Sequence, residues 1–403
     1  MRVVVLGGGY AGIVVATRLE ESLPEDVDLV LVDETGTHLV RHELHRLIRR
    51  PALAESIQIP LEQTLSRTNV LTDRVVGLDV EERAVHLDAG DSLDYDAAAL
   101  CLGSATDFHT ISGVEEHGIP LERPAHARAI RDRVEAIHDR GEGSIVVGGA
   151  GLAGIQAAGE VAEVIRRGGV DGVSVTILEE ASHVAPRFDG DFRAAISDAL
   201  ISRGVTVRTG AAVTGATDER VRTTDGDEFE YDCFVWTGGI RGTDALSGER
   251  PRVRADLRLA EGTFALGDAA TVIDAEGSGV TPSAQAAIRQ GRVAAGNILA
   301  RIEGLREPGG FRPRYQKYRY DPMAWVVSVG DAAVAKVGPQ VLTGSPAKAL
   351  KSTVGVGYLS SAGAIREAVG LVREEFGYAI PDVLERTPES KAADEQIDRG
   401  GGG

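Results

Sequence analysis

Short apolar runs alternate with helix-forming stretches at the start of the chain. Residues 2–6 form a mostly apolar run, residues 13–21 have the composition of a helix, and residues 27–32 form a second apolar run that ends at Asp33. Continuous apolar runs of this length are typical of strands buried on both faces of a parallel sheet. The pattern therefore predicts a strand, a helix and a second strand.

The same pattern occurs a second time, further along the chain. Residues 144–147 are apolar, residues 155–166 favour a helix, and residues 173–178 form another apolar run that ends at Glu179. An internal duplication of this kind indicates two copies of one supersecondary unit. The chain is thus expected to hold two similar α/β units, with a hinge at residues 141–143 before the second one.

The rest of the chain has weaker patterns. Pro282 stands near the first turn of a long helical stretch, and Gly355 and Gly357 weaken another. The expected elements are a strand at 263–268, a helix at 283–302, strands broken by turns at 311–341, a helix at 346–377 and a disordered tail at 388–403.

A glycine-rich turn joins the first strand to the helix in both units. In the pattern Gly-x-Gly-x-x-Gly, the first Gly makes the turn, the second lets a pyrophosphate approach the backbone, and the third lets helix and strand pack closely. One match is weak, but two matches that each open a strand–helix–strand unit are specific. The matching positions are Gly7, Gly9 and Gly12, and then Gly149, Gly151 and Gly154.

An acidic residue ends the second strand of each unit. A carboxylate at this place accepts hydrogen bonds from ribose hydroxyls and repels a 2′-phosphate. Asp33 and Glu179 occupy the position, with a helix cap or a solvated surface acid as the alternative interpretation. Glu179 and Glu180 have no Arg beside them, which predicts a preference for NADH over NADPH.

Five segments, in this order, resemble the two-dinucleotide-binding flavoproteins of the pyridine nucleotide-disulfide oxidoreductase type. The resemblance covers about residues 1–330 and is greatest to type II NADH dehydrogenases, the single-subunit NADH:quinone oxidoreductases. The segments are GGGYAG (7–12), VVGGAGLAGIQAAGE (146–160), FVWTGGIRG (234–242), FALGDAA (264–270) and TPSAQAAIRQG (281–291).

The resemblance implies an α/β fold with two Rossmann-like dinucleotide-binding domains, for FAD and for NAD, plus a small C-terminal α+β region. The FAD domain is expected to be split by the insertion of the NAD domain. The implied ranges are 1–110 and 240–310 for FAD, 111–239 for NAD(H), 311–385 for a C-terminal region on the membrane or acceptor side, and 386–403 for the disordered tail.

The resemblance also implies roles for single residues. Asp268 is expected to bind the ribityl chain of the flavin, and the start of the 283–302 helix is expected to face the flavin N1–C2=O edge, where its positive end favours the anionic reduced form. The expected FAD residues are Gly7, Gly9, Tyr10, Ala11, Gly12, Asp33, Glu34, His42, Val75, Leu102, Gly103, Ser104, Gly267, Asp268, Ala284 and Gln285. Those for NADH are Gly149, Gly151, Leu152, Ala153, Gly154, Glu179, Gly238 and Gly239.

Three positions depart from the family pattern. The family has a Glu near the nicotinamide where this chain has Gln156, and an amide can form hydrogen bonds but cannot act as a base. At the positions of Gln285 and Arg289 in this chain, the family has Gln at both. The guanidinium of Arg289 suits a quinone carbonyl or an acidic acceptor; the alternative is that Arg289 is simply an exposed helical Arg. Residues 38–46 are unusually polar. Gln156, Gln285 and Arg289 are the expected catalytic residues.

The implied activity is hydride transfer from NADH to FAD, followed by transfer of two electrons to an acceptor. A quinone is the leading acceptor. The first alternative is a soluble reductase for a ferredoxin-like protein. The second is a low-turnover, redox-responsive protein that binds NADH and FAD, for which Gln156 is the main support.

The formal charge of −18 makes nucleic acid an unfavourable partner, because that ligand requires a basic face. Only five of the 43 basic residues are Lys. An acidic, Lys-poor surface is typical of proteins that work in high salt, and a coding bias toward Arg explains the same counts equally well.

The cysteines and histidines argue against two other kinds of chemistry. Two cysteines, Cys101 and Cys233, cannot form a disulfide framework or a four-Cys metal site, and they do not resemble the redox pair of disulfide reductases. His38, His42 and His45 have helical spacing, but metal ligation needs better-defined partners. No metal site is therefore expected.

The subcellular location is predicted from the apolar runs, the N-terminal residues and the distribution of charge. No run of 18 apolar residues occurs, and the N-terminus enters a strand without a signal peptide. Residues 311–351 hold seven basic and two acidic residues, so a cytoplasmic protein that docks on the membrane surface through residues 311–380 is expected. The alternative is a structural cap over the FAD domain. The sequence leaves open whether the chain forms a homodimer.

Overall fold

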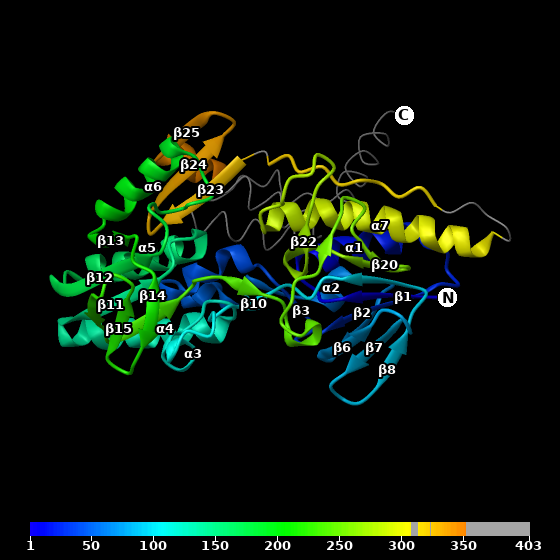
Figure 1. Cartoon of the computed structure of the whole chain (residues 1–403), viewed down its shortest axis with the longest axis horizontal. Coiled ribbons are helices and arrows are strands. Elements are labelled where there is room, and N and C mark those ends of the chain that lie inside the picture. Colours follow the sequence, from blue (N-terminus) through cyan, green and yellow to red (C-terminus); the bar gives the residue numbers. More distant parts are fainter. Residues whose placement is uncertain (308–312, 323, 352–403) are drawn as a thin grey trace, which may run out of the picture.

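Two lobes lie side by side in the computed structural model, which describes residues 1–307, 313–322 and 324–351 (Figure 1). The first lobe, called the split lobe here, comprises residues 1–104 and 242–307. The second, the inserted lobe, comprises residues 107–239. The chain leaves the split lobe along β10 (Ala105–Thr106) and returns along β18 (Ile240–Arg241), and these two strands pair antiparallel. The insertion expected from the sequence is therefore present.

A six-stranded sheet forms the centre of the split lobe, in the order β20-β21-β9-β1-β2-β5. All neighbouring strands are parallel except β20 and β21. Val3, Val4, Val5 and Leu6 of β1 are fully buried, as expected for a strand covered on both faces. The bounds are β1 (Arg2–Leu6), β2 (Asp28–Asp33), β5 (Asn69–Thr72), β9 (Ala97–Leu100), β20 (Arg258–Ala260) and β21 (Thr263–Ala265).

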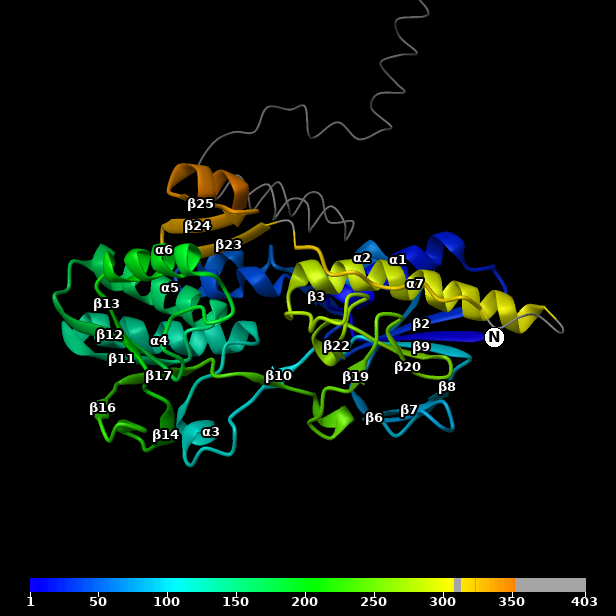
Figure 2. The same cartoon turned by 45° about the horizontal axis from the view of Figure 1, so that its top comes forward.

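Helices cover one face of this sheet and a small antiparallel sheet covers the other (Figure 2). α1 (Tyr10–Ser22) and α7 (Ala284–Arg306) pack against each other. Gly291 of α7 permits this approach, because a Cβ there would lie 2.9 Å from the carbonyl oxygen of Ala11. The opposite sheet consists of β6 (Val75–Asp79), β7 (Ala84–Leu87) and β8 (Ser92–Asp94).

The inserted lobe contains a four-stranded parallel sheet in the order β13-β12-β11-β17. Its helices are amphipathic. The apolar faces of α5 and α6 include the buried residues Ile155, Val161, Phe192 and Ile196. The bounds are β11 (Glu142–Gly148), β12 (Gly172–Glu179), β13 (Val205–Thr209), β17 (Cys233–Trp236), α4 (Pro124–Arg140), α5 (Leu152–Gly168), α6 (Gly190–Ile201), and a second sheet of β14 (Val213–Ala216), β15 (Arg220–Thr223) and β16 (Glu228–Glu230).

The C-terminal strands pack on the inserted lobe. β23 (Ala324–Val329), β24 (Ala332–Val337) and β25 (Gln340–Thr343) form an antiparallel sheet that contacts α5 and α6. Val327, Val329 and Val334 belong to the same buried cluster as the apolar side chains of those two helices. This sheet therefore extends the core of the inserted lobe.

One segment of the split lobe also enters that core. The 3-10 helices η1 (Arg41–Ile48) and η2 (Pro51–Ala54) precede the insertion by more than 50 residues, yet η1 packs on α4 and α5. Leu44, Leu47, Ile48 and Leu53 are buried in the cluster of the inserted lobe. η1 consequently joins the two lobes.

The remaining elements are short. They are β3 (Thr37–Leu39), β4 (Gln58–Pro60), α2 (Leu61–Thr64), α3 (Val114–His117), η3 (Asp244–Leu246), β19 (Arg252–Val253), η4 (Gly267–Ala269) and β22 (Thr271–Val272).

The strands and helices of both duplicated units are confirmed, with helices that begin several residues earlier than expected, at the glycine turns themselves. The hinge is wrong: Gly141 ends α4 with φ +82°, and Gly143 already belongs to β11. The strand expected at 263–268 stops at Ala265. The strands within 311–341 are confirmed, and residues 345–351 are helical. The rest of the 346–377 helix and the tail lie outside the described residues.

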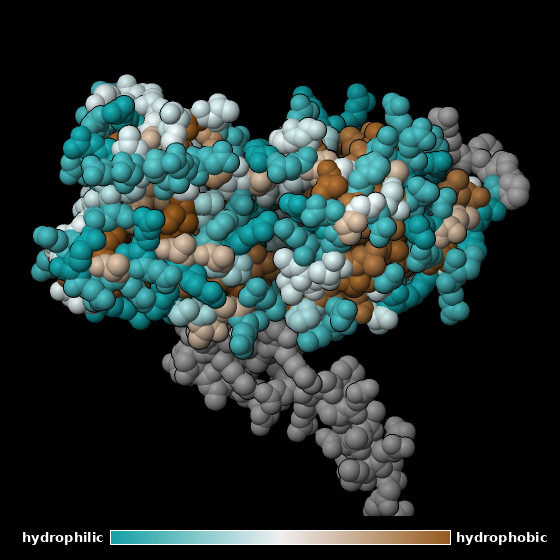
Figure 3. Space-filling model, turned by 90° about the horizontal axis from the view of Figure 1, so that it is seen from below, coloured by the Kyte–Doolittle hydropathy of each residue, from teal (hydrophilic) through white to brown (hydrophobic). Residues whose placement is uncertain are grey.

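Hydrophilic side chains cover most of the face shown in Figure 3, and its hydrophobic residues gather mainly over the split lobe. Of the helices in the described ranges, none has the length and apolar composition needed to cross a bilayer.

Replacement of Gly12 by Val is expected to destabilise the split lobe. A Cβ at Gly12 would lie 1.8 Å from the carbonyl oxygen of Gly7, and relieving such an overlap costs about 1–3 kcal/mol or more. Urea unfolding would measure the loss. Gly190→Ala is the control, because nothing lies within 4 Å of its added Cβ; equal stability of the two variants would contradict the assigned packing.

Candidate active site

A cavity of about 550 Å³ lies where the two lobes meet. Its wall combines the first glycine turn, the start of η1, the first turn of α5, the start of α7 and the strand β23. The lining residues from these five places include Gly7, Gly9, Tyr10, Ala11, Arg41, His42, Glu43, His45, Leu152, Ala153, Gln156, Ser283, Ala284, Gln285, Ala324 and Trp325. Segments far apart in the sequence thus share one site.

The three glycines of the first turn each have a separate role, as a pyrophosphate site requires. Gly7 has φ +98°, and an added Cβ there would lie 2.5 Å from the carbonyl oxygen of Cys101. Gly9 has nothing within 4 Å of an added Cβ, so its open side can accept a ligand. Gly12 is closed off by the backbone of Gly7. The start of α1 therefore offers backbone N–H groups beside open space.

The second glycine turn repeats this geometry. Gly149 has φ +94°, and its added Cβ would lie 2.9 Å from the carbonyl oxygen of Thr237. Gly151 is open, while a Cβ at Gly154 would lie 2.0 Å from the carbonyl oxygen of Gly149. Two independent turns with the same open middle glycine fit two dinucleotides.

The acids that end the second strands stabilise the turns themselves. Asp33 Oδ2 accepts a hydrogen bond from Gly8 N at 2.8 Å, and Oδ1 accepts from Thr35 N at 2.9 Å. Asp33 also lines the cavity, as does Glu34.

Glu179 differs from Asp33 in being buried, with 6% of its surface exposed. Its Oε2 accepts from Ala150 N at 2.6 Å and its Oε1 accepts from Ala181 N at 2.9 Å. Glu179 therefore stabilises the second turn as Asp33 stabilises the first, and its expected contact with the ribose stays a prediction. The exposed carboxylate next to it belongs to Glu180.

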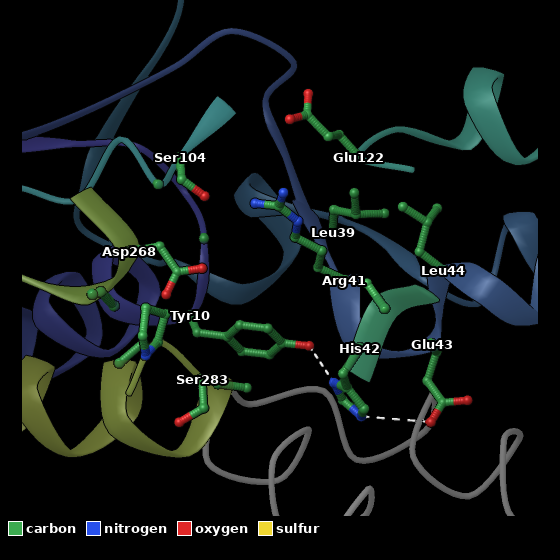
Figure 4. A pocket seen from close by; sticks show the side chains of 18 of the residues that line it. Tyr10, Leu39, Arg41, His42, Glu43, Leu44, Ser104, Glu122, Asp268 and Ser283 are labelled. Carbon is green, nitrogen blue, oxygen red and sulfur yellow. Dashed lines mark hydrogen bonds and ion pairs between the residues drawn. The ribbon is translucent and has the colours of Figure 1, made fainter. Parts of the chain in front are cut away.

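The start of α7 and η4 form the opposite wall (Figure 4). Ser283 caps α7 by accepting from Ala286 N at 3.2 Å, which leaves the first N–H groups of the helix facing the cavity at Ala284 and Gln285. Asp268 points into the cavity beside them. Gln290, which the sequence analysis missed, is buried and accepts from Gly267 N at 2.7 Å; it holds the turn that carries Asp268.

Ser104 supplies a further indication of a polar ligand. Its Oγ is buried at the cavity wall, and within the described part of the chain no hydrogen-bond partner is recorded for it. An unpaired buried hydroxyl is costly, and a bound polar group would satisfy it. Together with Asp268, the open Gly9 and the α7 N-terminus, it fits the flavin and phosphates of FAD.

The inserted lobe and the C-terminal sheet close the cavity on its other side. Gln156 Nε2 donates to Ser328 Oγ at 3.4 Å, and His45 Nε2 lies 2.8 Å from the same Oγ. Burial lowers the pKa of His45 well below its usual value, and the cation of Lys351 adds to the effect. His45 is therefore neutral near pH 7.

A partly buried polar cluster occupies the start of η1, where Glu43 is buried and the His42 side chain is 26% exposed. The Tyr10 hydroxyl is hydrogen-bonded to His42 Nδ1, and His42 Nε2 lies 3.6 Å from Glu43 Oε1 (Figure 4). Glu43 Oε2 forms ion pairs with Arg46 at 2.6 Å and with Lys351 at 3.9 Å. Although burial raises the pKa of Glu43, these cations outweigh it and hold that pKa well below its usual value. Burial lowers the pKa of His42 to about 4.

The three histidines of this region have separate partners. His38 Nδ1 is 2.9 Å from the carbonyl oxygen of Gly8, His42 contacts Tyr10, and His45 contacts Ser328. In the described ranges, no three His, Cys, Asp or Glu side chains gather in a way that could hold a metal ion.

The structure brings together most of the expected FAD residues, and it places some expected residues elsewhere. Arg289 does not line the cavity, because its guanidinium donates to the carbonyl oxygen of Asp321. Val75 is buried in the core of the split lobe. Gly238 and Gly239 lie beside the second turn, where Gly239 has φ +158°. Gly103 and Leu102 line the cavity.

Several lining residues were missed in the sequence. The polarity of residues 38–46 was visible, but it did not assign a role to Glu43 or His45. Trp325 and Lys351 reach the cavity only because β23 and the following segment fold back on the inserted lobe, and nothing in the local sequence indicates that. The missed residues are Thr35, Thr37, Leu39, Arg41, Glu43, Leu44, His45, Cys101, Leu121, Glu122, Leu266, Pro282, Ser283, Ala287, Ala324, Trp325, Val326 and Lys351.

Both cysteines are buried and unpaired. Burial raises the pKa of the Cys233 thiol to about 12 and that of Cys101 further still. The reactive thiolate is therefore scarce at neutral pH.

The lobes and the two glycine turns define an oxidoreductase fold with two dinucleotide-binding domains. The model of the pyridine nucleotide-disulphide oxidoreductase family matches residues 1–291, and the chain belongs to this family. A type II NADH:quinone oxidoreductase of Staphylococcus epidermidis is 28% identical over 335 residues, covering 75% of this chain and 83% of that protein.

Solved structures share the fold at lower sequence identity. The NDH2 structure from Plasmodium falciparum in complex with NADH has a TM-score of 0.77 and 13% identity, and the match covers 93% of this chain and 98% of that one. The sulfide:quinone oxidoreductase of Aquifex aeolicus has a TM-score of 0.75, 17% identity and coverages of 93% and 95%. A ferredoxin reductase from Rhodopseudomonas palustris has a TM-score of 0.68 and 20% identity, and the match covers 84% of this chain and 82% of that one.

Replacement of the exposed Glu180 by Arg is expected to raise catalytic efficiency with NADPH relative to NADH by about tenfold or more, because a charge-assisted hydrogen bond to a 2′-phosphate replaces repulsion. Steady-state kinetics with both nucleotides measure the ratio. Glu219→Arg, at an exposed turn of the same lobe, is the control. An unchanged ratio in Glu180→Arg would contradict a position of Glu180 beside the adenosine ribose, and equal use of both nucleotides by the unmodified protein would contradict the predicted preference for NADH.

Proposed function

We propose that this chain is an FAD-dependent NADH dehydrogenase of the type II kind, which passes the electrons of NADH through its flavin to a quinone. The observation that carries the proposal is the shared cavity. The FAD turn, the α7 N-terminus and Asp268 from the split lobe face the first turn of the NAD helix α5, with Leu152, Ala153 and Gln156, across one space. A nicotinamide and a flavin can meet only where these two sets of residues meet.

The residues of the cavity bind and orient the two dinucleotides. Bound FAD supplies the redox chemistry, because its ring accepts a hydride and releases electrons. The first N–H groups of α7 would stabilise negative charge on a flavin ring bound beside them. Gln156, held by Ser328, is expected to position the nicotinamide as a neutral hydrogen-bonding group. The protein's contribution is therefore positioning and electrostatic stabilisation.

A soluble reductase for a ferredoxin-like acceptor remains the second candidate. Its support from the sequence was Arg289 and the polar segment 38–46. The segment lines the cavity, whereas the Arg289 side chain donates to the carbonyl oxygen of Asp321 and does not enter the cavity. The low-turnover binding protein rests on Gln156. That residue lines the cavity, so it is compatible with bound NADH in either case.

A stopped-flow experiment without oxygen separates these candidates. The purified protein is expected to be yellow, to bleach on mixing with one equivalent of NADH, and to recover its colour within seconds on mixing with a short-chain quinone. Both phases are measured by flavin absorbance.

Recovery with a ferredoxin but not with a quinone would replace the proposal by the soluble reductase. Bleaching that neither acceptor reverses would favour the low-turnover binding protein. Protein without flavin that also fails to take up added FAD would overturn all three.

We further propose peripheral contact with the cytoplasmic face of a membrane through residues 311–380. The excess of basic residues supports it. Several of these charges are already paired, however, since Lys336 contacts Asp189, Arg319 contacts Glu276, and Lys351 lies 3.9 Å from Glu43. Residues 352–380 lie outside the described ranges. A homodimer is compatible with this arrangement, and light scattering would detect it.

Vesicle sedimentation tests the membrane contact. The full chain is expected to bind vesicles that contain anionic lipid, and binding should weaken as salt rises because the attraction is electrostatic. Neutral vesicles are the control. A full chain that stays in the supernatant with anionic vesicles at low salt would remove the proposed contact.

A further inference from the structure

Reduction of a quinone by NADH consumes one proton beyond the hydride, in the balance NADH + H⁺ + quinone → NAD⁺ + quinol. This inference rests on the proposed function. The proton must reach a quinone oxygen inside the cavity, and a buried group is needed to deliver it. Tyr10 and His42 of the polar cluster at the start of η1 are expected beside FAD, no role has yet been given to Glu43, and all three residues lie on the cavity wall.

Tyr10, His42 and Glu43 form a continuous chain of polar contacts from the first glycine turn to η1 (Figure 4). The Tyr10 hydroxyl contacts His42 Nδ1, and His42 Nε2 is 3.6 Å from Glu43 Oε1. All three residues line the cavity. Tyr10 follows Gly9 directly, so its ring extends across the cavity from the place where the flavin is expected.

We propose that Tyr10 and His42 deliver this proton, Tyr10 as the donor to the quinone oxygen and His42 as the group that reprotonates Tyr10, with Glu43 as the positioning residue of His42. The arrangement is a hydroxyl, an imidazole and a carboxylate in sequence. In such a chain the carboxylate fixes the orientation of the imidazole and stabilises its charged form.

The step balances in atoms and charge. In charged His42, Nδ1–H donates to the Tyr10 oxygen and Nε2–H faces Glu43. The Tyr10 O–H bond breaks as the new O–H bond forms on the quinone, and the Nδ1 proton moves to the Tyr10 oxygen. His42 becomes neutral and retains Nε2–H. The two electrons and the other proton come from NADH by way of the flavin, and His42 regains its proton from solvent.

The charges around His42 suit this cycle. Burial lowers its pKa to about 4, Glu43 acts in the opposite direction, and Lys351, His38 and Arg46 lower it further. His42 is thus neutral in the oxidised protein near pH 7. Because electrons bring negative charge into the cavity, they favour the charged form of His42. Proton uptake by His42 is therefore coupled to reduction.

Tyr10→Phe and His42→Gln test the proposal by separating electron transfer from proton transfer. Both variants are expected to reduce quinone about 10- to 100-fold more slowly, since a positioned proton donor contributes on this scale. Expressed per bound flavin, NADH bleaching and the reduction of ferricyanide should fall much less than quinone reduction, because ferricyanide accepts electrons without protons. Flavin content and the thermal midpoint verify folding.

Two matched substitutions act as controls. Tyr95→Phe removes another buried tyrosine hydroxyl, which is 2.8 Å from Thr263 Oγ1 in the core of the split lobe. His86→Gln changes an exposed histidine of β7. Neither is expected to change the ratio of quinone to ferricyanide activity. A cluster that only stabilises the fold would instead lower both activities together, or neither.

A spectroscopic readout is independent of turnover. Ring signals of ¹⁵N-labelled histidines, assigned by comparison with His42→Gln, should show His42 neutral in the oxidised protein at pH 7 and charged after reduction with dithionite.

Four outcomes are decisive. A lowered quinone-to-ferricyanide ratio in both variants and a charged His42 after reduction support the proposal. An unchanged ratio in an unmodified protein that reduces quinone overturns it, as does a His42 signal that ignores reduction. An unmodified protein that bleaches with NADH but reduces no quinone would instead overturn the proposed function.

Discussion

The attachment of η1 to the inserted lobe is the constraint on which the site depends. Arg49, just after η1, forms a buried ion pair with Glu160 of α5 at 2.5 Å and another with Asp331 of the C-terminal sheet at 2.9 Å. Loss of one member of such a pair leaves an uncompensated buried charge and costs about 3–5 kcal/mol. Leu44 and Ile48 add apolar burial on the same side. One short segment of the split lobe is thereby fixed to two elements of the other part of the chain.

This attachment explains why polar side chains of η1 lie at the cavity between the lobes. The apolar side of η1 is anchored in the inserted lobe, so its remaining side chains, including His42 and Glu43, must face the cavity. Burying them costs free energy that only good pairing offsets, and Glu43 obtains that pairing from Arg46 and Lys351. Departures from an apolar interior of this kind occur mainly at functional sites.

The sequence predicted what local rules determine and missed what tertiary packing determines. The glycine turns, Asp268 and the start of α7 are encoded in short segments whose backbone geometry requires those residues, and they lie in the cavity or beside it. The position of Glu179 at the end of a strand does not reveal that its carboxylate accepts hydrogen bonds from two backbone N–H groups of the turn. Of the two interpretations of Arg289, the structure favours the helical Arg outside the cavity, because its guanidinium donates to the carbonyl of Asp321, a contact that no local pattern indicates. Trp325 and Lys351 had no signal at all.

The charge balance of the cavity links Gln156 to Glu43. Related flavoproteins are expected to have a carboxylate where this chain has Gln156, and here the cavity carries a carboxylate on η1 instead. Two buried carboxylates at one cavity would repel each other, and one would be forced toward protonation. With a neutral amide at Gln156, Glu43 stays ionised beside its two cations and is able to support a charged His42. The neutral amide on α5 and the carboxylate on η1 line one cavity, so the charge of that cavity cannot be derived from either segment alone.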